Sequence, residues 1–200
     1  ATLLEKQGYT AADLRTAGSP ERFRKRVIFP IRDTLGNVVG FTGRLLPEVH
    51  PPSPHQGGAT VGVGPAGPKY YNTPETPIFR KSKLVYGLAE AKQAIRTNKQ
   101  AILMEGQMDV VLSHPAGVAT AVASSGTAIT LDHLKAIKRY TNQVWLAFDS
   151  DPAGVAATKK TLGLAFDAEL AARVIPIPDG AKDAGEVIER DPKAWVEAAK

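Results

Sequence analysis

Cysteine is absent from this 200-residue sequence, which excludes disulfide bonds and cysteine-ligated zinc and gives no sign of an oxidising compartment. Long apolar runs are absent too, since none approaches the roughly 18 residues that a membrane-spanning helix needs. Residues 1–20 carry acids and lack the apolar centre of a signal peptide. We therefore expect a cytoplasmic protein. The sequence begins without methionine and ends in a helical pattern, so we expect it to be part of a larger protein.

A strong excess of either charge is also missing. The net charge of +5 and the pI of about 9.4 permit a polyanionic partner without requiring one. Hydrophobic residues make up 43% of the chain, which is enough for one compact domain or two small ones. Local patterns, rather than overall composition, must therefore indicate the function.

The first half of the chain is predicted to contain a β-hairpin. Residues 27–31 and 38–41 are rich in β-branched and apolar residues, and the segment 33–37 between them has the glycine and asparagine of a turn. Short helical patterns precede the hairpin at residues 3–6 and 10–17. This half therefore reads as a small α+β subdomain.

Three further segments of this half have unusual composition. Residues 22–26 carry four cations around Phe23, either as a solvated charged stretch or as a binding element. Residues 47–68 are rich in Pro, Gly and His, and we read no function from them. In residues 69–83, cations alternate with aromatic side chains. That pattern suits a phosphate backbone and its bases, but it also suits a packed loop whose aromatics fill the interface between two subdomains, and both can hold.

Strands and helices alternate in the second half. A helical stripe of Leu84, Leu88, Ala91 and Ile95 has Ser82 as its expected cap. Apolar strands are then predicted at 101–104, 118–123, 144–148 and 171–177, with helices around 110–112, 130–139, 153–166, 186–188 and 192–199. This alternation predicts an α/β fold with a parallel sheet and helices on both faces.

Carboxylates follow two of these strands. Glu105 ends the first strand and Asp109 lies four residues later, while Asp149 and Asp151 follow the third strand. The carboxyl ends of parallel strands share one edge of a sheet, so we expect these acids to converge with no lysine or arginine between them. Such carboxylates repel one another, and a hard divalent cation, Mg²⁺ or Mn²⁺, would neutralise them. The alternative is that each acid merely caps, or lies near, a helix N-terminus.

Several motifs resemble known families. The pattern E-G-x-x-D at 105–109 and the D-x-D at 149–151 resemble the TOPRIM signature of primases, topoisomerases and some nucleases. The segments RVIFPIRD (26–33), GFTGR (40–44) and PKYYNTPETPIF (68–79) resemble the bacterial replicative primases of the DnaG type. Lys81 with LVYGL (84–88) and SGTA (125–128) match the same family, and the resemblance runs from about residue 3 to residue 200.

The resemblance implies an arrangement of domains and a set of site residues. Residues 1–83 would be the C-terminal part of the N-terminal core subdomain, and residues 84–200 the TOPRIM catalytic domain. Glu105, Asp149 and Asp151 would be catalytic, with Glu105 acting as a metal ligand or a general base. The metal ligands would be Glu105, Asp109, Asp149, Asp151 and Asp183.

One turn departs from the family pattern. The primase motif D-P-D-E is Asp183-Ala184-Gly185-Glu186 in this chain, so its second aspartate is missing. A basic ridge that contacts template and nucleotide phosphates is matched by Arg44, Lys69, Asn72 and Lys81. The cations of the aromatic segment add Arg80 and Lys83 to the nucleic-acid-binding set.

The implied activity is DNA-templated synthesis of short RNA primers, with two or more Mg²⁺ or Mn²⁺ ions and no zinc in this fragment. The expected partners are a single-stranded DNA template, ribonucleoside triphosphates and the RNA primer, in the bacterial cytoplasm at the replisome. A replicative helicase would bind only through a C-terminal domain outside this chain. Alternatives are another TOPRIM enzyme (nuclease or topoisomerase), a primase of a phage or mobile element, and a non-catalytic nucleic-acid-binding module.

Overall fold

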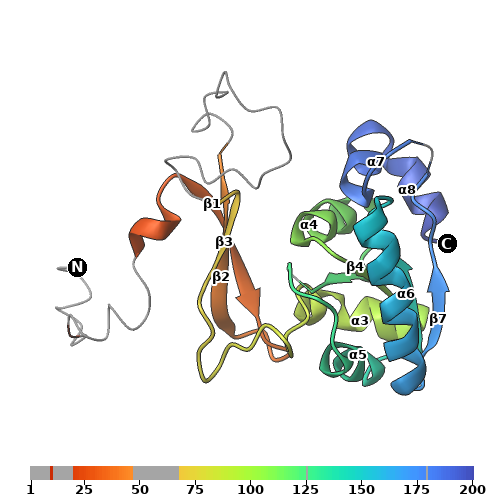
Figure 1. Ribbon diagram of the computed structural model, residues 1–200, viewed down its shortest axis with the longest axis horizontal. Coiled ribbons are helices and arrows are strands. Elements are labelled where there is room, and N and C mark those ends of the chain that lie inside the picture. Colours follow the sequence, from red (N-terminus) through yellow and green to blue (C-terminus); the bar gives the residue numbers. More distant parts are fainter. Residues whose placement is uncertain (1–9, 11–19, 47–67, 125, 179) are drawn as a thin grey trace. The chain divides into compact units, whose positions relative to one another are not determined.

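The computed structural model describes Thr10 and residues 20–46, 68–124, 126–178 and 180–200. The helices expected at 3–6 and 10–17 (Thr10 apart) and nearly all of the 47–68 segment lie outside the described residues. The chain divides into two compact units, drawn in Figure 1. The first unit comprises Ala1–Ile31 and Val38–Thr76, and the second comprises Arg32–Asn37 and Pro77–Lys200.

The first unit contains the predicted hairpin. A 3₁₀ helix, η1 (Pro20–Phe23), precedes β1 (Arg26–Arg32) and β2 (Val38–Leu45), and β3 (Tyr70–Asn72) completes a sheet of order β1-β2-β3. Strand β3 runs antiparallel to β2, with Arg44 opposite Tyr70. The hairpin loop belongs to the second unit, and Asp33 closes it by accepting hydrogen bonds from the backbone N–H groups of Leu35 and Asn37, both at 2.9 Å.

Two cations of the 22–26 run have structural contacts in the first unit. The Arg26 guanidinium donates to the carbonyls of Gly43 at 3.1 Å and Pro68 at 2.7 Å, which ties the end of β2 to the residues just before β3. Arg22 donates to the Tyr71 hydroxyl at 3.2 Å, and the ring of Phe23 packs edge-on against Tyr71 with centroids 5.1 Å apart. Arg22 and Arg26 therefore stabilise the first unit through hydrogen bonds and are not simply solvated charges.

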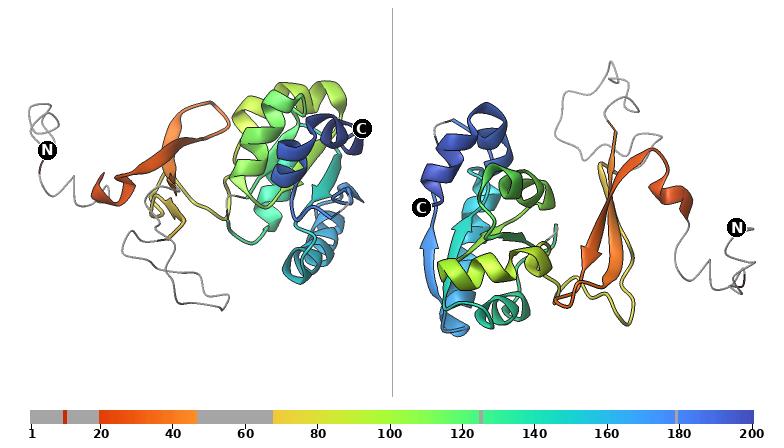
Figure 2. Two further views of the ribbon diagram at one scale, coloured as in Figure 1. Left: turned by 90° about the horizontal axis from the view of Figure 1, so that it is seen from above. Right: turned by 180° about the vertical axis from the view of Figure 1, so that it is seen from behind.

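The second unit is built on a four-stranded parallel sheet with helices on both faces, as the alternation predicts (Figures 1 and 2). Its strand order is β5 (Ala121–Ala123), β4 (Ala101–Met104), β6 (Gln143–Ala147), β7 (Ala171–Val174). The helices are α3 (Leu88–Asn98), α4 (Gln107–Ala116), α5 (Leu131–Lys138), α6 (Pro152–Asp167), α7 (Ala184–Arg190) and α8 (Pro192–Ala198).

The core of the second unit lies on both sides of this sheet because strand side chains alternate between its faces. Leu103 and Leu146 point to the side covered by α3, α5 and α6. Ile102, Met104 and Trp145 point to the side covered by α4, α7 and α8, where Trp195 is fully buried. No helix in the described part of the chain is long and apolar enough to cross a membrane.

The predicted start of the first long helix is wrong. Helix α3 begins at Leu88 after Gly87, whose φ of 79° favours glycine, and Ser82 does not cap it. The preceding Tyr86 instead pairs with Ala123, the last residue of β5, and its N–H donates to the Ala123 carbonyl at 2.8 Å. Two strands are also shorter than expected, since β5 begins at Ala121 and β7 ends at Val174.

Candidate metal and nucleic-acid site

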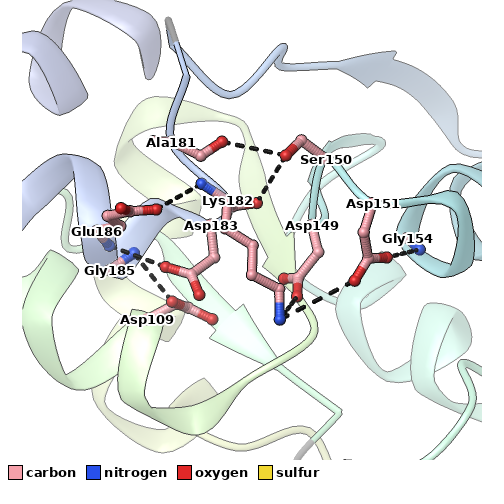
Figure 3. A network of polar contacts seen from close by, with 10 residues as sticks. All are labelled: Asp109, Asp149, Ser150, Asp151, Gly154, Ala181, Lys182, Asp183, Gly185 and Glu186. Atoms are coloured by element: carbon pink, nitrogen blue, oxygen red, sulfur yellow. Dashed lines mark hydrogen bonds and ion pairs between the residues drawn. The ribbon is translucent and has the colours of Figure 1, made fainter. Parts of the chain in front are cut away.

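Glu105 and Asp149 follow neighbouring strands of the parallel sheet. Strands β4 and β6 pair with Met104 opposite Ala147, so Glu105 and the Asp149 segment leave the sheet at the same edge. Figure 3 shows that Asp109 of α4 and Asp183, the residue before α7, come to the same place. The structure therefore brings together the strand-end acids that the sequence selects.

Local backbone geometry explains the spacing of the D-x-D motif. Asp151 is the N-cap of α6, and its Oδ1 accepts a hydrogen bond from the Gly154 N–H at 2.9 Å. A Cβ at position 154 would lie 2.1 Å from the Asp149 carbonyl oxygen, so only glycine lets the first turn of α6 approach the Asp149 backbone. The two aspartates are thus held by the start of one helix.

The turn that departs from the family pattern contacts Asp109 through its backbone. The Gly185 N–H donates to Asp109 Oδ1 at 3.0 Å, and a Cβ at position 185 would lie 3.0 Å from the same oxygen. Asp183 caps α7 by accepting a hydrogen bond from the Glu186 N–H at 2.8 Å. Position 185, where the family pattern has an aspartate, is therefore a glycine whose backbone N–H holds the Asp109 carboxylate.

A lysine missed by the sequence prediction lies between the carboxylates. Lys182 Nζ is 3.6 Å from Asp149 Oδ2 and 4.0 Å from Asp151 Oδ2 (Figure 3), which corrects the expectation that no lysine or arginine would separate the acids. The Lys182 backbone is fixed as well, because its N–H donates to Glu186 and its carbonyl accepts from Ser150. Its only sequence signal was its place next to Asp183.

The electrostatics of the edge favour a cation. Burial raises the pKa of Asp109 to about 6, and Asp183 adds to the rise against the hydrogen bond from Gly185. Burial also raises the pKa of Glu105, helped by Asp149, and it raises the pKa of Asp149 despite Lys182. Glu105 Oε1 is buried and has no hydrogen-bond partner. Within the described residues, no three acidic or histidine side chains are already close enough to bind one metal ion together. The donors at this edge are nevertheless carboxylate oxygens, one of them without a hydrogen-bond partner, and such donors fit a hard divalent ion.

The predicted nucleic-acid-binding residues are divided between the two units. Arg44 lies on β2, Asn72 on β3 and Lys69 just before β3, all in the first unit. The second unit holds the other three, Arg80, Lys81 and Lys83. Arg80 and Lys83 line a pocket of that unit, whereas the Lys81 carbonyl is bound by His133 at 2.7 Å.

The aromatics of the 69–83 segment are partly structural. Phe79 is buried, and Tyr71 packs against Phe23 in the first unit. Lys69 Nζ lies over the ring of Tyr70, 5.8 Å from its centroid. These contacts support the interpretation as a packed loop, and the nucleic-acid-binding interpretation of this segment stays a prediction.

Two family models match the chain, one on each side of residue 100. Residues 2–92 match the DNA primase catalytic core, N-terminal domain, and residues 102–188 match a Toprim-like domain. The fold and the acidic edge thus define a class of protein, a Toprim-like sheet preceded by the N-terminal domain of a primase core. Membership of this class implies dependence on a divalent metal.

The relatives narrow the class to one family. The DNA primase of Synechococcus elongatus is 39% identical over 196 residues, which cover 95% of this chain and 26% of the relative. A solved DnaG catalytic core is 34% identical with a TM-score of 0.78, covering 100% of this chain and 62% of that chain. A DnaG catalytic domain bound to ssDNA is 33% identical with a TM-score of 0.75, covering 98% and 61%.

The chain therefore belongs to the DnaG-type bacterial primases, which confirms the resemblance seen in the sequence. It spans about a quarter of the length of the curated relatives it matches.

Proposed function

We propose that this chain is the part of a DNA primase that joins ribonucleotides on a single-stranded DNA template. The observation that carries the proposal is the shared edge of β4 and β6, where Glu105 and Asp149 meet and a buried Glu105 oxygen has no partner. A related catalytic domain bound to ssDNA supports the choice of template. The domains would be residues 1–83, the end of the N-terminal core subdomain, and residues 84–200, the Toprim catalytic domain.

Two or more Mg²⁺ or Mn²⁺ ions would bind at the acidic edge. The ligands would come from the carboxylates of Glu105, Asp109, Asp149, Asp151 and Asp183. Bound there, the metal supplies charge neutralisation for the triphosphate and a lower pKa for the attacking 3′-hydroxyl. Backbone N–H groups in the first turns of α6 and α7 hold Asp151 and Asp183 by hydrogen bonds, and the Gly185 N–H holds Asp109 in the same way.

The cations of the chain would position the charged partners. Arg44, Lys69, Asn72 and Lys81 would contact template and nucleotide phosphates, with Arg80 and Lys83 as further cations. Ribonucleoside triphosphates and the RNA primer complete the partners at the replisome in the bacterial cytoplasm. A replicative helicase would bind through a C-terminal domain that is not in this chain.

The test is the substitution Asp149→Ala in the primase that contains this chain. RNA synthesis on single-stranded template should fall at least about a hundredfold, because charge stabilisation is lost at the reacting phosphate. The fold should remain intact or become slightly more stable, since a repelling carboxylate is removed. Asp167→Ala, an exposed acid at the end of α6, is the matched control. Wild-type synthesis by Asp149→Ala would remove the acids from the mechanism.

A non-catalytic nucleic-acid-binding module is the second candidate, because Asp151 and Asp183 do cap helices. Capping does not explain Glu105, whose Oε1 is buried without a hydrogen-bond partner. Titration with Mn²⁺ distinguishes the two functions. A catalytic site should bind the ion in wild type and lose it in Asp149→Ala, whereas a binding module should show the same weak binding in both.

A further inference from the structure

A pocket of about 530 Å³ lies within the second unit and shares no residue with the acidic edge. Its lining comes from three segments, namely the hairpin loop with Thr34, the stretch that carries Ile78, Arg80 and Leu84, and the outer side of α5 with Arg139. This volume is in the range of sites that hold small ligands, roughly 300–1,000 Å³.

The walls of the pocket are fixed by hydrogen bonds. Thr130, the N-cap of α5, donates from its hydroxyl to the Ser82 carbonyl at 2.6 Å. Lys92 of α3 donates to the Thr34 carbonyl at 2.9 Å, which holds the hairpin loop against the helix. The lining segments are therefore positioned before any ligand arrives, and a ligand would not have to order them.

The lining carries four cations and two carboxylates. The Asp33 carboxylate is used inside its own loop, where it accepts hydrogen bonds from Leu35 and Asn37. Lys83 Nζ is 3.8 Å from Asp132, and Arg32 Nε is 3.4 Å from Glu90, outside the pocket.

The remaining two cations are Arg80 and Arg139, and both are exposed. Neither guanidinium makes an ion pair or hydrogen bond with any residue in the described part of the chain, although the backbones of both residues are hydrogen-bonded. Guanidinium groups bind phosphate oxygens with paired N–H donors, so these two arginines are suited to a phosphate.

An apolar surface lies beside these arginines. Ile78 is 72% exposed although it is one of the large apolar side chains of the unit, and Leu84 and Leu88 continue the lining. An inorganic anion would leave this surface in water. A ligand that has both a phosphate and a ring would cover it.

We propose that this pocket binds a nucleotide, with its phosphate on Arg80 and Arg139 and its base or sugar against Ile78 and Leu84. The site is separate from the acidic edge and does not depend on the metal ions proposed there. The same chemistry is offered by a free nucleotide and by one nucleotide of a single strand.

The experiment measures the binding of ADP to the purified chain by calorimetry in EDTA, so that no metal contributes. Arg139→Ala should weaken ADP binding about tenfold, because a charge-assisted contact to phosphate is lost. Lys135→Ala is the matched control, since it removes one exposed cation from the same helix but does not line the pocket. Its affinity for ADP should stay within about twofold of wild type.

Two further measurements define the ligand. Ile78→Ser should weaken ADP binding and leave pyrophosphate binding unchanged, as expected if the apolar surface receives the nucleoside. Binding of a ten-nucleotide thymidine strand distinguishes a free nucleotide from a nucleotide that belongs to a single strand. If Arg139→Ala weakens the decamer more than Lys135→Ala does, the pocket holds a nucleotide of a strand, and if only ADP is affected it holds a free nucleotide.

Three results would overturn the proposal. ADP could fail to bind, Arg139→Ala could leave its affinity unchanged, or both helix variants could weaken it equally, which would show diffuse charge attraction in place of a pocket. Exposed side chains are changed throughout, so loss of folding does not complicate the comparison.

Discussion

At the scale of single residues, the negative charge of Asp109 destabilises the folded chain, because the carboxylate is largely buried. Its pKa is raised from 3.8 to about 6, so the folded chain binds the proton more tightly than the unfolded chain does. The stability that this proton contributes is complete below pH 3.8 and is lost as the pH rises through about 6.

We therefore predict that Asp109→Asn stabilises the metal-free chain at pH 7.5 by about 3 kcal/mol. The asparagine oxygen can still accept the Gly185 N–H, so the substitution removes charge and keeps the contact. Urea unfolding in EDTA at pH 7.5 and pH 4 measures the effect. The gain should vanish at pH 4 and be absent in Asp167→Asn, and an equal gain at both values would contradict the electrostatic cause.

The acids of the site could be predicted from sequence, because a residue directly after a buried parallel strand has a fixed place in the fold. Glu105 directly follows β4, and Asp149 lies two residues beyond the end of β6 at the same edge of the sheet. Lys182 could not be predicted in this way, since it lies in the loop between β7 and α7. Its position between Asp149 and Asp151 depends on hydrogen bonds to Ser150 and Glu186, which no local pattern reveals.

At the scale of elements, helix α6 offers a comparison between two of its glycines. A Cβ at Gly154 would lie 2.1 Å from the Asp149 carbonyl oxygen, whereas a Cβ at Gly163 would meet nothing within 4 Å. Gly154→Ala should destabilise the chain by about 2–3 kcal/mol and displace Asp149. Gly163→Ala should stabilise it by about 0.5–1 kcal/mol, because alanine favours a helix.

Thermal unfolding with and without Mn²⁺ checks both substitutions. Stabilisation by Mn²⁺ should be lost in Gly154→Ala and kept in Gly163→Ala. If Gly154→Ala binds the ion as wild type does, the backbone of Asp149 is not a determinant of the site.

The N-terminus of α5 depends on a neutral histidine. His133 is fully buried, its Nδ1 accepts from the Thr130 N–H at 3.2 Å, and its Nε2 donates to the Lys81 carbonyl at 2.7 Å. A protonated ring could not accept the first of these bonds. Burial accordingly lowers the pKa of His133, against the hydrogen bond to Lys81 and the charge of Asp132.

We predict that part of the stability of the chain is lost as the pH falls below 6.5. In this range the histidine binds a proton in the unfolded chain but stays neutral in the folded chain, because its pKa is lowered there. His133→Gln should be less stable at pH 7.5 but should show a shallower loss between pH 7.5 and pH 5.5. Denaturant unfolding in EDTA at the two values measures the slopes, and equal slopes would show that another group causes the loss.

The fold of the second unit was predictable because strands β4 and β5 are wholly apolar, β6 is apolar after Gln143, and the helices keep their period. The errors lie where a contact distant in sequence overrides the local pattern. Leu84 continues the stripe of α3, yet Tyr86 pairs with Ala123, and the left-handed Gly87 then starts the helix at Leu88. A helical period cannot distinguish these residues from a true first turn.

At the scale of the whole molecule, the net charge of +5 permits a polyanionic partner, and the proposed binding of a single strand should be salt-sensitive. The logarithm of the affinity should fall linearly with the logarithm of salt concentration, and Lys69→Ala should reduce the slope by about 0.7. Lys160→Ala removes an equal charge from α6 and should leave the slope unchanged. Fluorescence anisotropy with labelled oligonucleotide at several salt concentrations measures both, and equal slopes for the two variants would contradict a localised contact.

The clamp made by Arg26 has a practical consequence. Leu45 donates to the Lys69 carbonyl at 2.9 Å, and Arg26 donates to the carbonyls of Gly43 and Pro68, so these hydrogen bonds join the end of β2 to the residues just before β3. Leu45 and Lys69 are separated by more than twenty residues of sequence, and inserted residues would raise the entropic cost of bringing them together only slowly. We therefore expect an affinity tag or a fluorophore inserted between Leu46 and Pro68 to leave the pairing of β2 with β3 intact.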